Sequence, residues 1–195
     1  MRPSLALLAG CVPHLYADGA DSAPTAWVPV ENTWKQCGTP SPYFYDESIG
    51  YDVGQRFPDA RLVDQNGDVV SMWQFTGCVT VVDMSTGWCG PCQKLARSVD
   101  ALYADYEADG VMYATLLSED VDYGDVDRQD LIDWSKNFGV TTTPLLEDHQ
   151  YTSELFNGGQ AAFPRVLILD AEMRVVNANV GQTDDLIRGA LDGIL

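Results

Sequence analysis

The strongest chemical signal in the sequence is a pair of cysteines separated by two residues, Cys89 and Cys92. This spacing lets the two sulfurs close a small ring. The pair also lies where a helix is predicted to begin, so unpaired backbone N–H groups stabilise a thiolate and lower the pKa of the first thiol below about 8.5. Cys89 is therefore predicted to attack a partner disulfide, and Cys92 to resolve the mixed disulfide. Gly90 and Pro91 fit this geometry, because a proline near the first helical position needs no N–H partner.

A Cys-x-x-Cys pair can also supply half of a structural zinc site. Such a site would need two more ligands, and the candidates are Cys37, Cys78, His14 and His149. None of these residues forms a second paired knuckle. We therefore expect no metal site, and nothing in the sequence calls for a cofactor.

A predicted strand-to-helix turn positions the cysteine pair. Residues 79–84 form a short β-branched run of the kind found in a buried strand, apart from one acid at Asp83. Residues 93–109 place apolar side chains at helical spacing, and Gly110 ends that helix. The cysteines thus lie between the end of a strand and the start of a helix.

The other predicted elements complete an α/β pattern of βαβ followed by ββα. Asn66 and Gly67 favour a tight hairpin turn, because they supply the positive φ angles that such a turn needs. The predicted elements are strands at 60–63 and 69–72, a strand at 111–117, a helix at 127–138, an extended piece at 144–146, strands at 166–170 and 174–177, and a helix at 184–195.

The five residues Trp88-Cys89-Gly90-Pro91-Cys92 match the motif of thioredoxins residue for residue. Over residues 52–195 the chain resembles the exported TlpA/ResA branch of the thioredoxin-like superfamily, which shares the Gly-x-x-x-Pro-Asp pattern at 54–59 and the segment at 163–170. The resemblance implies a thioredoxin-like fold: a central mixed β-sheet flanked by helices, with an N-terminal hairpin and an irregular extension. It also implies a thiol-disulfide oxidoreductase that exchanges with protein thiols or disulfides and draws on an upstream electron donor. In relatives, Cys-Gly-Pro-Cys favours the reductase direction.

The resemblance assigns a role to Asp83, which lies six residues before Cys89. Thioredoxins place a buried acid there, and it exchanges a proton with the resolving cysteine. A carboxyl group on a buried strand has a raised pKa, which suits a general base. The alternative is an acid that merely ends a strand. The residues before Trp88 lack the aromatic side chains common in the family, which predicts a more open site.

The resemblance also predicts a cis-proline opposite the cysteine pair, at Pro164. Pro144 is the rival candidate, but Pro164 directly precedes the closing ββα pattern. A cis bond is uncommon even before proline, about 5–6% in folded proteins. The predicted substrate-binding residues are Trp88, Gly90, Pro91, Phe163 and Pro164.

Residues 27–51 mix aromatic residues with prolines and show neither helical nor strand period, so we expect an irregular N-terminal extension packed on the main domain. Cys37 lies in this extension and Cys78 lies just before the strand that leads to the active site. In an oxidising compartment the two would form a structural disulfide that clamps the extension to that strand. Two separate buried thiols are the alternative.

The first eleven residues have the features of an export signal. Met1-Arg2-Pro3 carries one positive charge, a short mostly apolar run follows, and Leu8-Ala9-Gly10-Cys11 resembles the bacterial lipobox. Cys11 would then be lipidated, and residues 12–26 would form a flexible tether. This predicts an exported bacterial lipoprotein on the periplasmic or cell-envelope side, held to the membrane by its lipid anchor alone. The alternative is a frayed N-terminus with an accidental cysteine.

Twenty-nine acidic and eleven basic residues give a formal charge of -18. This charge repels phosphates, so we expect no nucleic-acid binding. With 46% hydrophobic residues the chain has the composition of a folded globular protein, and we expect a monomer.

Two other functions remain open at the level of sequence. Thr86-x-x-Cys89 matches part of the peroxiredoxin signature, although Val82 stands where that signature has proline. A surface lipoprotein that binds copper or a protein partner is the other alternative. Copper-delivering relatives use wider cysteine spacing and a downstream histidine, for which His149 is the candidate.

Overall fold

The central sheet of the computed structural model is mixed and has the strand order β5-β4-β3-β6-β7. The structure describes residues 26–41, 44, 48–149 and 162–195. Neighbouring strands β3, β4 and β5 are parallel, whereas β6 and β7 are antiparallel additions on the other side of β3. The strands are β3 (Val79–Ser85), β4 (Val111–Leu117), β5 (Leu145–Glu147), β6 (Arg165–Leu169) and β7 (Val175–Asn177).

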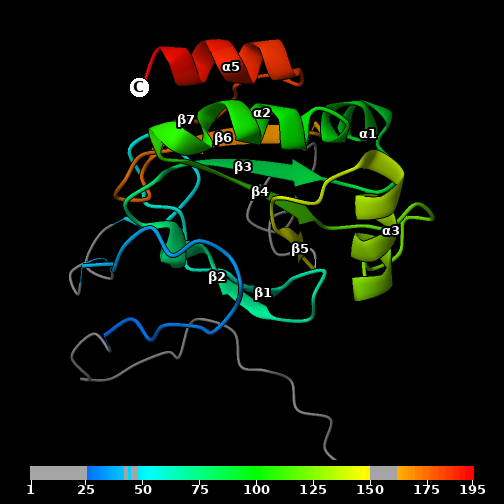
Figure 1. The fold of residues 1–195 in the computed structure, drawn as a ribbon, viewed down its shortest axis with the longest axis horizontal. Coiled ribbons are helices and arrows are strands. Elements are labelled where there is room, and N and C mark those ends of the chain that lie inside the picture. Colours follow the sequence, from blue (N-terminus) through cyan, green and yellow to red (C-terminus); the bar gives the residue numbers. More distant parts are fainter. Residues whose placement is uncertain (1–25, 42–43, 45–47, 150–161) are drawn as a thin grey trace, which may run out of the picture.

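Helices cover the sheet and a small hairpin lies beyond it (Figure 1). In that view α1, α2 and α5 lie above the sheet, α3 stands at the right, and the β1–β2 hairpin lies below. The predicted α/β architecture, a central mixed sheet flanked by helices with an N-terminal hairpin, is confirmed. The helices are α1 (Gly90–Ala96), α2 (Val99–Tyr106), α3 (Arg128–Phe138) and α5 (Asp184–Asp192), with 3-10 turns η2 (Met72–Phe75) and η3 (Glu107–Asp109).

The predicted helix at 93–109 is wrong in one respect, because it consists of α1, α2 and η3 with a break before Val99. Ser98 explains the break. Its backbone N–H and its hydroxyl both donate to the carbonyl of Leu95, at 2.9 and 2.8 Å, which is a local alternative to the helical hydrogen-bond ladder. Gly110 ends η3 with a φ of 84°, in the left-handed region that favours glycine.

The hairpin joins β1 (Arg61–Val63) to β2 (Val69–Ser71) through a turn organised by Asp64. The carboxylate oxygen Oδ1 of Asp64 accepts the backbone N–H groups of Asn66 and Asp68, each at 2.8 Å. Gly67 has a φ of 90°, the positive angle expected of this turn, but Asn66 does not have a positive φ, so that part of the prediction is wrong.

The extension is fastened to the domain by its tryptophans. The Trp27 indole N–H donates to the Ser71 hydroxyl at 2.9 Å, and that of Trp34 donates to the Asp64 carboxylate at 2.5 Å. Residues 26–41 contain no helix or strand, which agrees with an irregular segment packed on the domain. The predicted signal at 1–11, with Cys11, lies outside the described residues, as does the tether up to residue 25.

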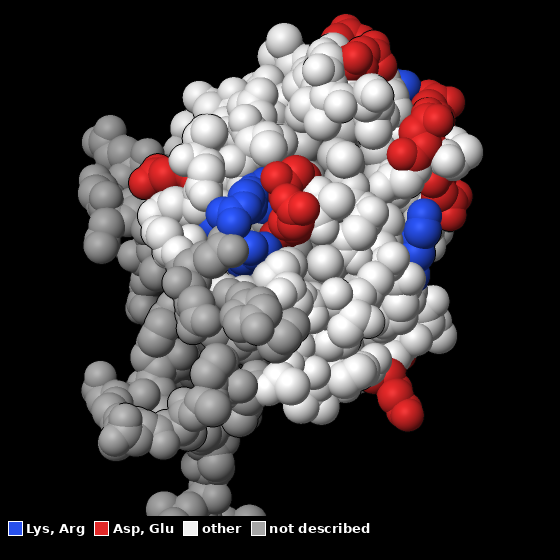
Figure 2. Space-filling model, turned by 90° about the vertical axis from the view of Figure 1, so that its left-hand side faces the viewer, with Lys and Arg blue, Asp and Glu red and all other residues white. Residues whose placement is uncertain are grey.

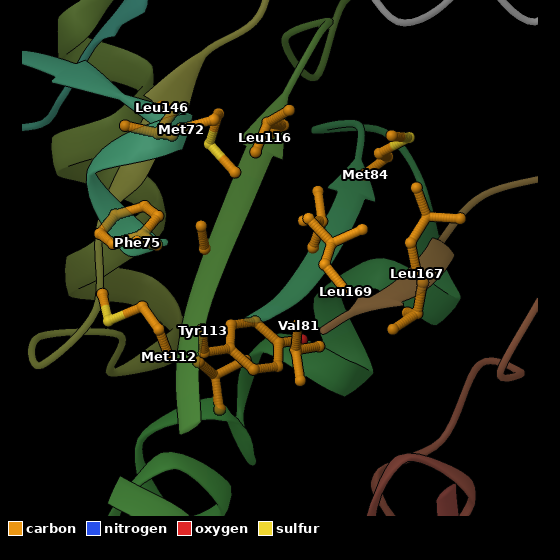
Figure 3. Packing of buried hydrophobic residues seen from close by; sticks show 14 of the residues in the cluster. Met72, Phe75, Val81, Met84, Met112, Tyr113, Leu116, Leu146, Leu167 and Leu169 are labelled. Atoms are coloured by element: carbon orange, nitrogen blue, oxygen red, sulfur yellow. The ribbon is translucent and has the colours of Figure 1, made fainter. Parts of the chain in front are cut away.

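The core is formed by both faces of the sheet. Figure 3 shows Met72 and Phe75, from η2, on one side of β4, and Val81, Tyr113 and Leu169 grouped on neighbouring strands. Strands β3 and β4 pair along their whole length, from Val79↔Val111 to Ser85↔Leu117, and β4 is buried throughout. These central strands therefore form a rigid support for the turn after β3, which leads to Cys89.

The surface shown in Figure 2 carries its charged side chains in small separate groups, several of which contain both signs. The described part of this face has no broad basic patch of the kind that binds nucleic acid. Within the described residues, no helix combines the length and the apolar character needed to cross a bilayer.

Candidate active site

Cys89 occupies the N-cap of α1, directly after the turn that follows β3. Its backbone is extended, with φ -79° and ψ 108°, and its Sγ accepts the backbone N–H of Cys92 at 3.2 Å. The two cysteines form a disulfide with an S–S distance of 2.06 Å and a Cα–Cα distance of 5.2 Å. A sulfur that accepts an N–H at a helix start is electrostatically favoured as a thiolate. Cys89 is 3% exposed and Cys92 fully buried, so a partner reaches Cys89 first.

The turn before the cysteines is closely packed, and the prediction of a more open site is wrong. Ser85 and Thr86 are fully buried. At Gly87 an added Cβ would lie 2.6 Å from the backbone carbon of Asp120, so only glycine fits there. The backbone of Gly87 donates to the carbonyl of Glu119 at 2.7 Å and accepts from the Gln93 amide at 2.8 Å.

Asp83 is buried on β3, the strand that runs into this turn. One carboxylate oxygen accepts the Ser85 hydroxyl at 2.8 Å and the other accepts the Tyr113 hydroxyl at 3.2 Å. Burial raises the pKa of Asp83 to about 6, and the two hydroxyl donors oppose that rise. The pKa of Tyr113 is also raised, by burial and by the charge of Asp83. A carboxyl group with such a pKa changes its protonation state close to neutral pH.

The peptide bond between Phe163 and Pro164 is cis. It directly precedes β6, whose Arg165 pairs with Met84 of β3, so Pro164 lies beside the end of β3 and the cysteine turn. The rival residue, Pro144, leads into β5, and its carbonyl accepts the backbone N–H of Thr115 at 3.1 Å. The Thr143–Pro144 bond is not cis.

Trp88, which directly precedes Cys89, contacts two other aromatic rings. Its ring stacks on Tyr123, with centroids 5.1 Å apart and an interplanar angle of 23°, and meets Phe163 edge-on at 6.1 Å. The indole N–H of Trp88 donates to the Glu119 carboxylate at 2.5 Å. The sequence reasoning identified Trp88 and Phe163 but missed Tyr123 and Glu119, which come from the loop after β4.

Residues 53–178 match the model of the AhpC/TSA family. The chain belongs to the AhpC/TSA family.

Relatives of this AhpC/TSA family chain are thiol-disulfide proteins. The thiol-disulfide oxidoreductase ResA of Bacillus thuringiensis is 21% identical over 152 residues, which is 77% of this chain and 83% of the relative. The thioredoxin domain of a thiol-disulfide oxidoreductase from Bacteroides vulgatus superimposes with a TM-score of 0.59 at 20% identity, covering 74% of this chain and 99% of that one. A Chlorobium tepidum protein assigned as a thiol:disulfide interchange protein, DsbE, gives 0.62 at 22% identity, covering 74% and 98%. The predicted superfamily and class of enzyme are confirmed.

A pocket of about 190 Å³ lies beside the cysteine turn, between that turn, the loop after β4 and α3. Three carboxylates line it and no lining residue is basic. Within the described ranges, no group of three or more histidine, cysteine or acidic residues could hold a metal ion. The lining residues are Gly87, Gln93, Leu117, Asp120, Val121, Asp130, Asp133, Trp134, Asn137 and Phe138.

A second disulfide joins Cys37 of the extension to Cys78, with a Cα–Cα distance of 5.6 Å. Backbone contact is close there, since a Cβ on Gly77 would lie 2.9 Å from the carbonyl oxygen of Cys37. Cys78 precedes β3 and Cys89 follows it, so the seven residues of the strand separate the two disulfides by about 20 Å. At that distance the two disulfides cannot exchange directly. The Cys37–Cys78 bond therefore has a structural role, because it links the N-terminal extension to the residue before β3.

Proposed function

We propose that this thiol-disulfide oxidoreductase reduces disulfides of proteins outside the cytoplasm, with Cys89 as nucleophile and Cys92 as resolving thiol. The observation that carries the proposal is the disulfide at the start of α1, where Cys89 Sγ accepts the Cys92 N–H at 3.2 Å. That contact favours the Cys89 thiolate in the reduced protein.

The reaction proceeds by two exchanges. The Cys89 thiolate attacks one sulfur of the partner disulfide, which forms a mixed disulfide and releases the first partner thiolate. Asp83 then accepts the proton of the Cys92 thiol, and the Cys92 thiolate attacks the Cys89 sulfur. The second partner thiolate leaves, so the partner gains two electrons and this protein is left with the Cys89–Cys92 disulfide. A dithiol donor restores it by the reverse steps.

The proposed compartment and anchor have separate support. A second disulfide, Cys37–Cys78, persists only where thiols are not kept reduced, which favours a location outside the cytoplasm. The lipobox-like residues before Cys11 support a lipid anchor. Mass spectrometry of membrane-extracted protein tests this: a diacylglycerol-modified Cys11 at the mature N-terminus is expected, and an unmodified Met1 would refute it.

The reductase direction is tested by the reduction potential of the Cys89–Cys92 pair, measured against glutathione. Thioredoxin lies near -270 mV and the oxidant DsbA near -120 mV, so we expect a value close to the former. A value near that of DsbA would reverse the proposed direction. An insulin-reduction assay with dithiothreitol supplies the activity, and undiminished turnover in Cys89→Ser would remove Cys89 from the mechanism.

A peroxidase is the second candidate, because the chain belongs to the AhpC/TSA family and the buried Thr86 hydroxyl has no hydrogen-bond partner. In that reaction the Cys89 thiolate attacks one oxygen of a hydroperoxide and the O–O bond breaks. Cys89 becomes a sulfenic acid, and the other oxygen leaves as an alcohol or as water. Cys92 then condenses with it to the disulfide and releases water. Consumption of hydrogen peroxide as fast as insulin reduction, and lost in Thr86→Val, would favour the peroxidase.

A further inference from the structure

Trp88, the residue before Cys89, contacts the rings of Tyr123 and Phe163, and we call these three side chains the aromatic rim. Trp88 is 37% exposed and Tyr123 is 70% exposed, so much of this apolar surface faces solvent. Tyr123 packs on Trp88 and is otherwise open, so burial of its ring contributes little to the fold. Exposed aromatic surface beside a reactive group marks a contact site.

The loop that carries Tyr123 is built to hold it there. The Asp120 carboxylate oxygen Oδ1 accepts the backbone N–H groups of Asp122 and Gly124, each at 2.7 Å, and the Asp120 N–H donates to the Gly124 carbonyl at 2.9 Å. Between them Tyr123 adopts a φ of 67°, in the left-handed region that an aromatic residue rarely enters. Residues held in uncommon backbone conformations cluster at functional sites, so the conformation of Tyr123 indicates that its side chain has a role there.

A partner that exchanges with Cys89 comes close to this rim, because Trp88 directly precedes Cys89 in the chain. Cys89 is nearly buried, and Trp88, the exposed residue directly before it in the chain, contacts both Tyr123 and Phe163. In the mixed disulfide the partner sulfur is bonded to Cys89 at about 2 Å. The residues next to the partner cysteine therefore lie within reach of the rim.

The charges around the rim restrict the partner further. Residues 119–125 read Glu-Asp-Val-Asp-Tyr-Gly-Asp, with four acids and no basic residue. The pocket behind the loop adds the carboxylates of Asp130 and Asp133. A basic segment is attracted to this edge, whereas an acidic segment is repelled.

We infer that Tyr123 is a specificity-determining residue: with Trp88 and Phe163 it binds an aromatic or large aliphatic side chain next to the target cysteine of a basic partner segment. This inference rests on the proposed thiol-disulfide exchange at Cys89. The occupant is a segment of a substrate protein, since exchange itself brings that segment to the rim.

Three synthetic peptides test the inference with the full chain. Each is closed by a disulfide between its two cysteines. The first has phenylalanine before the first cysteine and lysine at both ends, the second has glycine in place of phenylalanine, and the third has glutamate ends. The neutral small molecule 2-hydroxyethyl disulfide reports exchange without any side chain to bind. We expect the first peptide to have the lowest KM.

Tyr123→Ala should raise the KM for the phenylalanine peptide by roughly three- to tenfold, the usual range for one aromatic contact, with kcat nearly unchanged. The glycine peptide and the small disulfide should be unaffected. Tyr123→Phe should restore the wild-type KM, because the ring and not the hydroxyl makes the contact. Val176→Ala, an exposed apolar truncation on β7, is the matched control and should change nothing.

Each other result contradicts a stated step. Equal KM values for the phenylalanine and glycine peptides in the wild type would overturn the inference, and equal values for lysine and glutamate ends would overturn its charge requirement. Loss of small-disulfide exchange in Tyr123→Ala would show that Tyr123 only supports the cysteine turn. If the wild type reduced none of the four disulfides, the proposed function itself would fail, which is a separate outcome.

Discussion

Replacing Asp83 by asparagine should make the protein more stable at neutral pH while impairing its chemistry. Asparagine has the shape of aspartate, and its amide can still pair with the hydroxyls of Ser85 and Tyr113, which contact the carboxylate at 2.8 and 3.2 Å. What the substitution removes is a negative charge in a fully buried position. Burial of that charge opposes folding.

The size of the effect follows from the pKa of Asp83, which burial raises from 3.8 to about 6. Below about pH 3 the carboxyl group is mostly neutral in both folded and unfolded chains, so its burial costs little. As the pH rises from about 4 to 6 the unfolded chain loses its proton first, and the folded state loses stability relative to it. Above pH 7 both are ionised, and the loss reaches about 3 kcal/mol, from 1.36 kcal/mol per pKa unit.

Urea unfolding of wild type and Asp83→Asn at pH 4, 5.5 and 7.5 measures this directly. The stability gain of the variant should be about 0.5 kcal/mol at pH 4 and grow to about 3 kcal/mol at pH 7.5. Asp185→Asn, at an exposed acid of α5, is the matched control and should show no such growth. A variant that is less stable than wild type at pH 7.5, or whose gain is the same at every pH, would refute the reasoning.

Three further predictions concern residues around β3. Cys37→Ser with Cys78→Ser should lower the free energy of unfolding by about 4 kcal/mol in urea, since the disulfide closes a loop with a sequence separation of 41. Gly87→Ala should reduce both stability and insulin reduction, because its Cβ would lie 2.6 Å from loop backbone. Tyr113→Phe should raise the pKa of Asp83, because it removes a hydrogen bond that lowers that pKa; the pH at which resolution of the mixed disulfide accelerates should therefore move upward.

Each of these predictions can fail in a distinct way. An unchanged unfolding midpoint in the double serine variant would mean that the Cys37–Cys78 disulfide does not stabilise the protein by constraining its unfolded chain. Normal activity of Gly87→Ala would mean that the turn can move away from the Asp120 loop. A pH profile of Tyr113→Phe that is unchanged or moved downward would remove the tyrosine hydroxyl from the control of Asp83.

The strands and the cysteine turn could be predicted because local patterns determine them. The apolar run at 111–117 has the bounds of β4, and the run at 79–84 falls one residue short of β3. Glycines that favour the end of a helix also do so where expected: Gly110 ends η3 and Gly139 ends α3. These features depend on residues close together in the sequence.

The features that sequence reasoning missed depend on long-range pairing. Tyr113 faces the carboxylate of Asp83 because β3 and β4 pair in a register that sets Val81 opposite Tyr113 and Asp83 opposite Thr115. Residues two apart share a face of the sheet, so the contact follows once the register is known. Tyr123 gave no periodic signal at all, since it lies in an acidic loop whose conformation Asp120 holds through hydrogen bonds.

Strand β3 therefore begins next to the Cys37–Cys78 disulfide and ends near Asp83 and the cysteine turn. The contributions of the disulfide and of Asp83 to the free energy of unfolding should be independent. The Cys37–Cys78 disulfide fastens the first end, while the ionised Asp83 destabilises the other, about 15–20 Å away. Sites that far apart usually add. A protein lacking the Cys37–Cys78 disulfide should unfold more readily at pH 7.5 than at pH 4, and Asp83→Asn should restore about 3 of the 4 kcal/mol lost. A rescue much smaller than the effect of Asp83→Asn alone would show that the clamp and the buried acid are coupled through the strand.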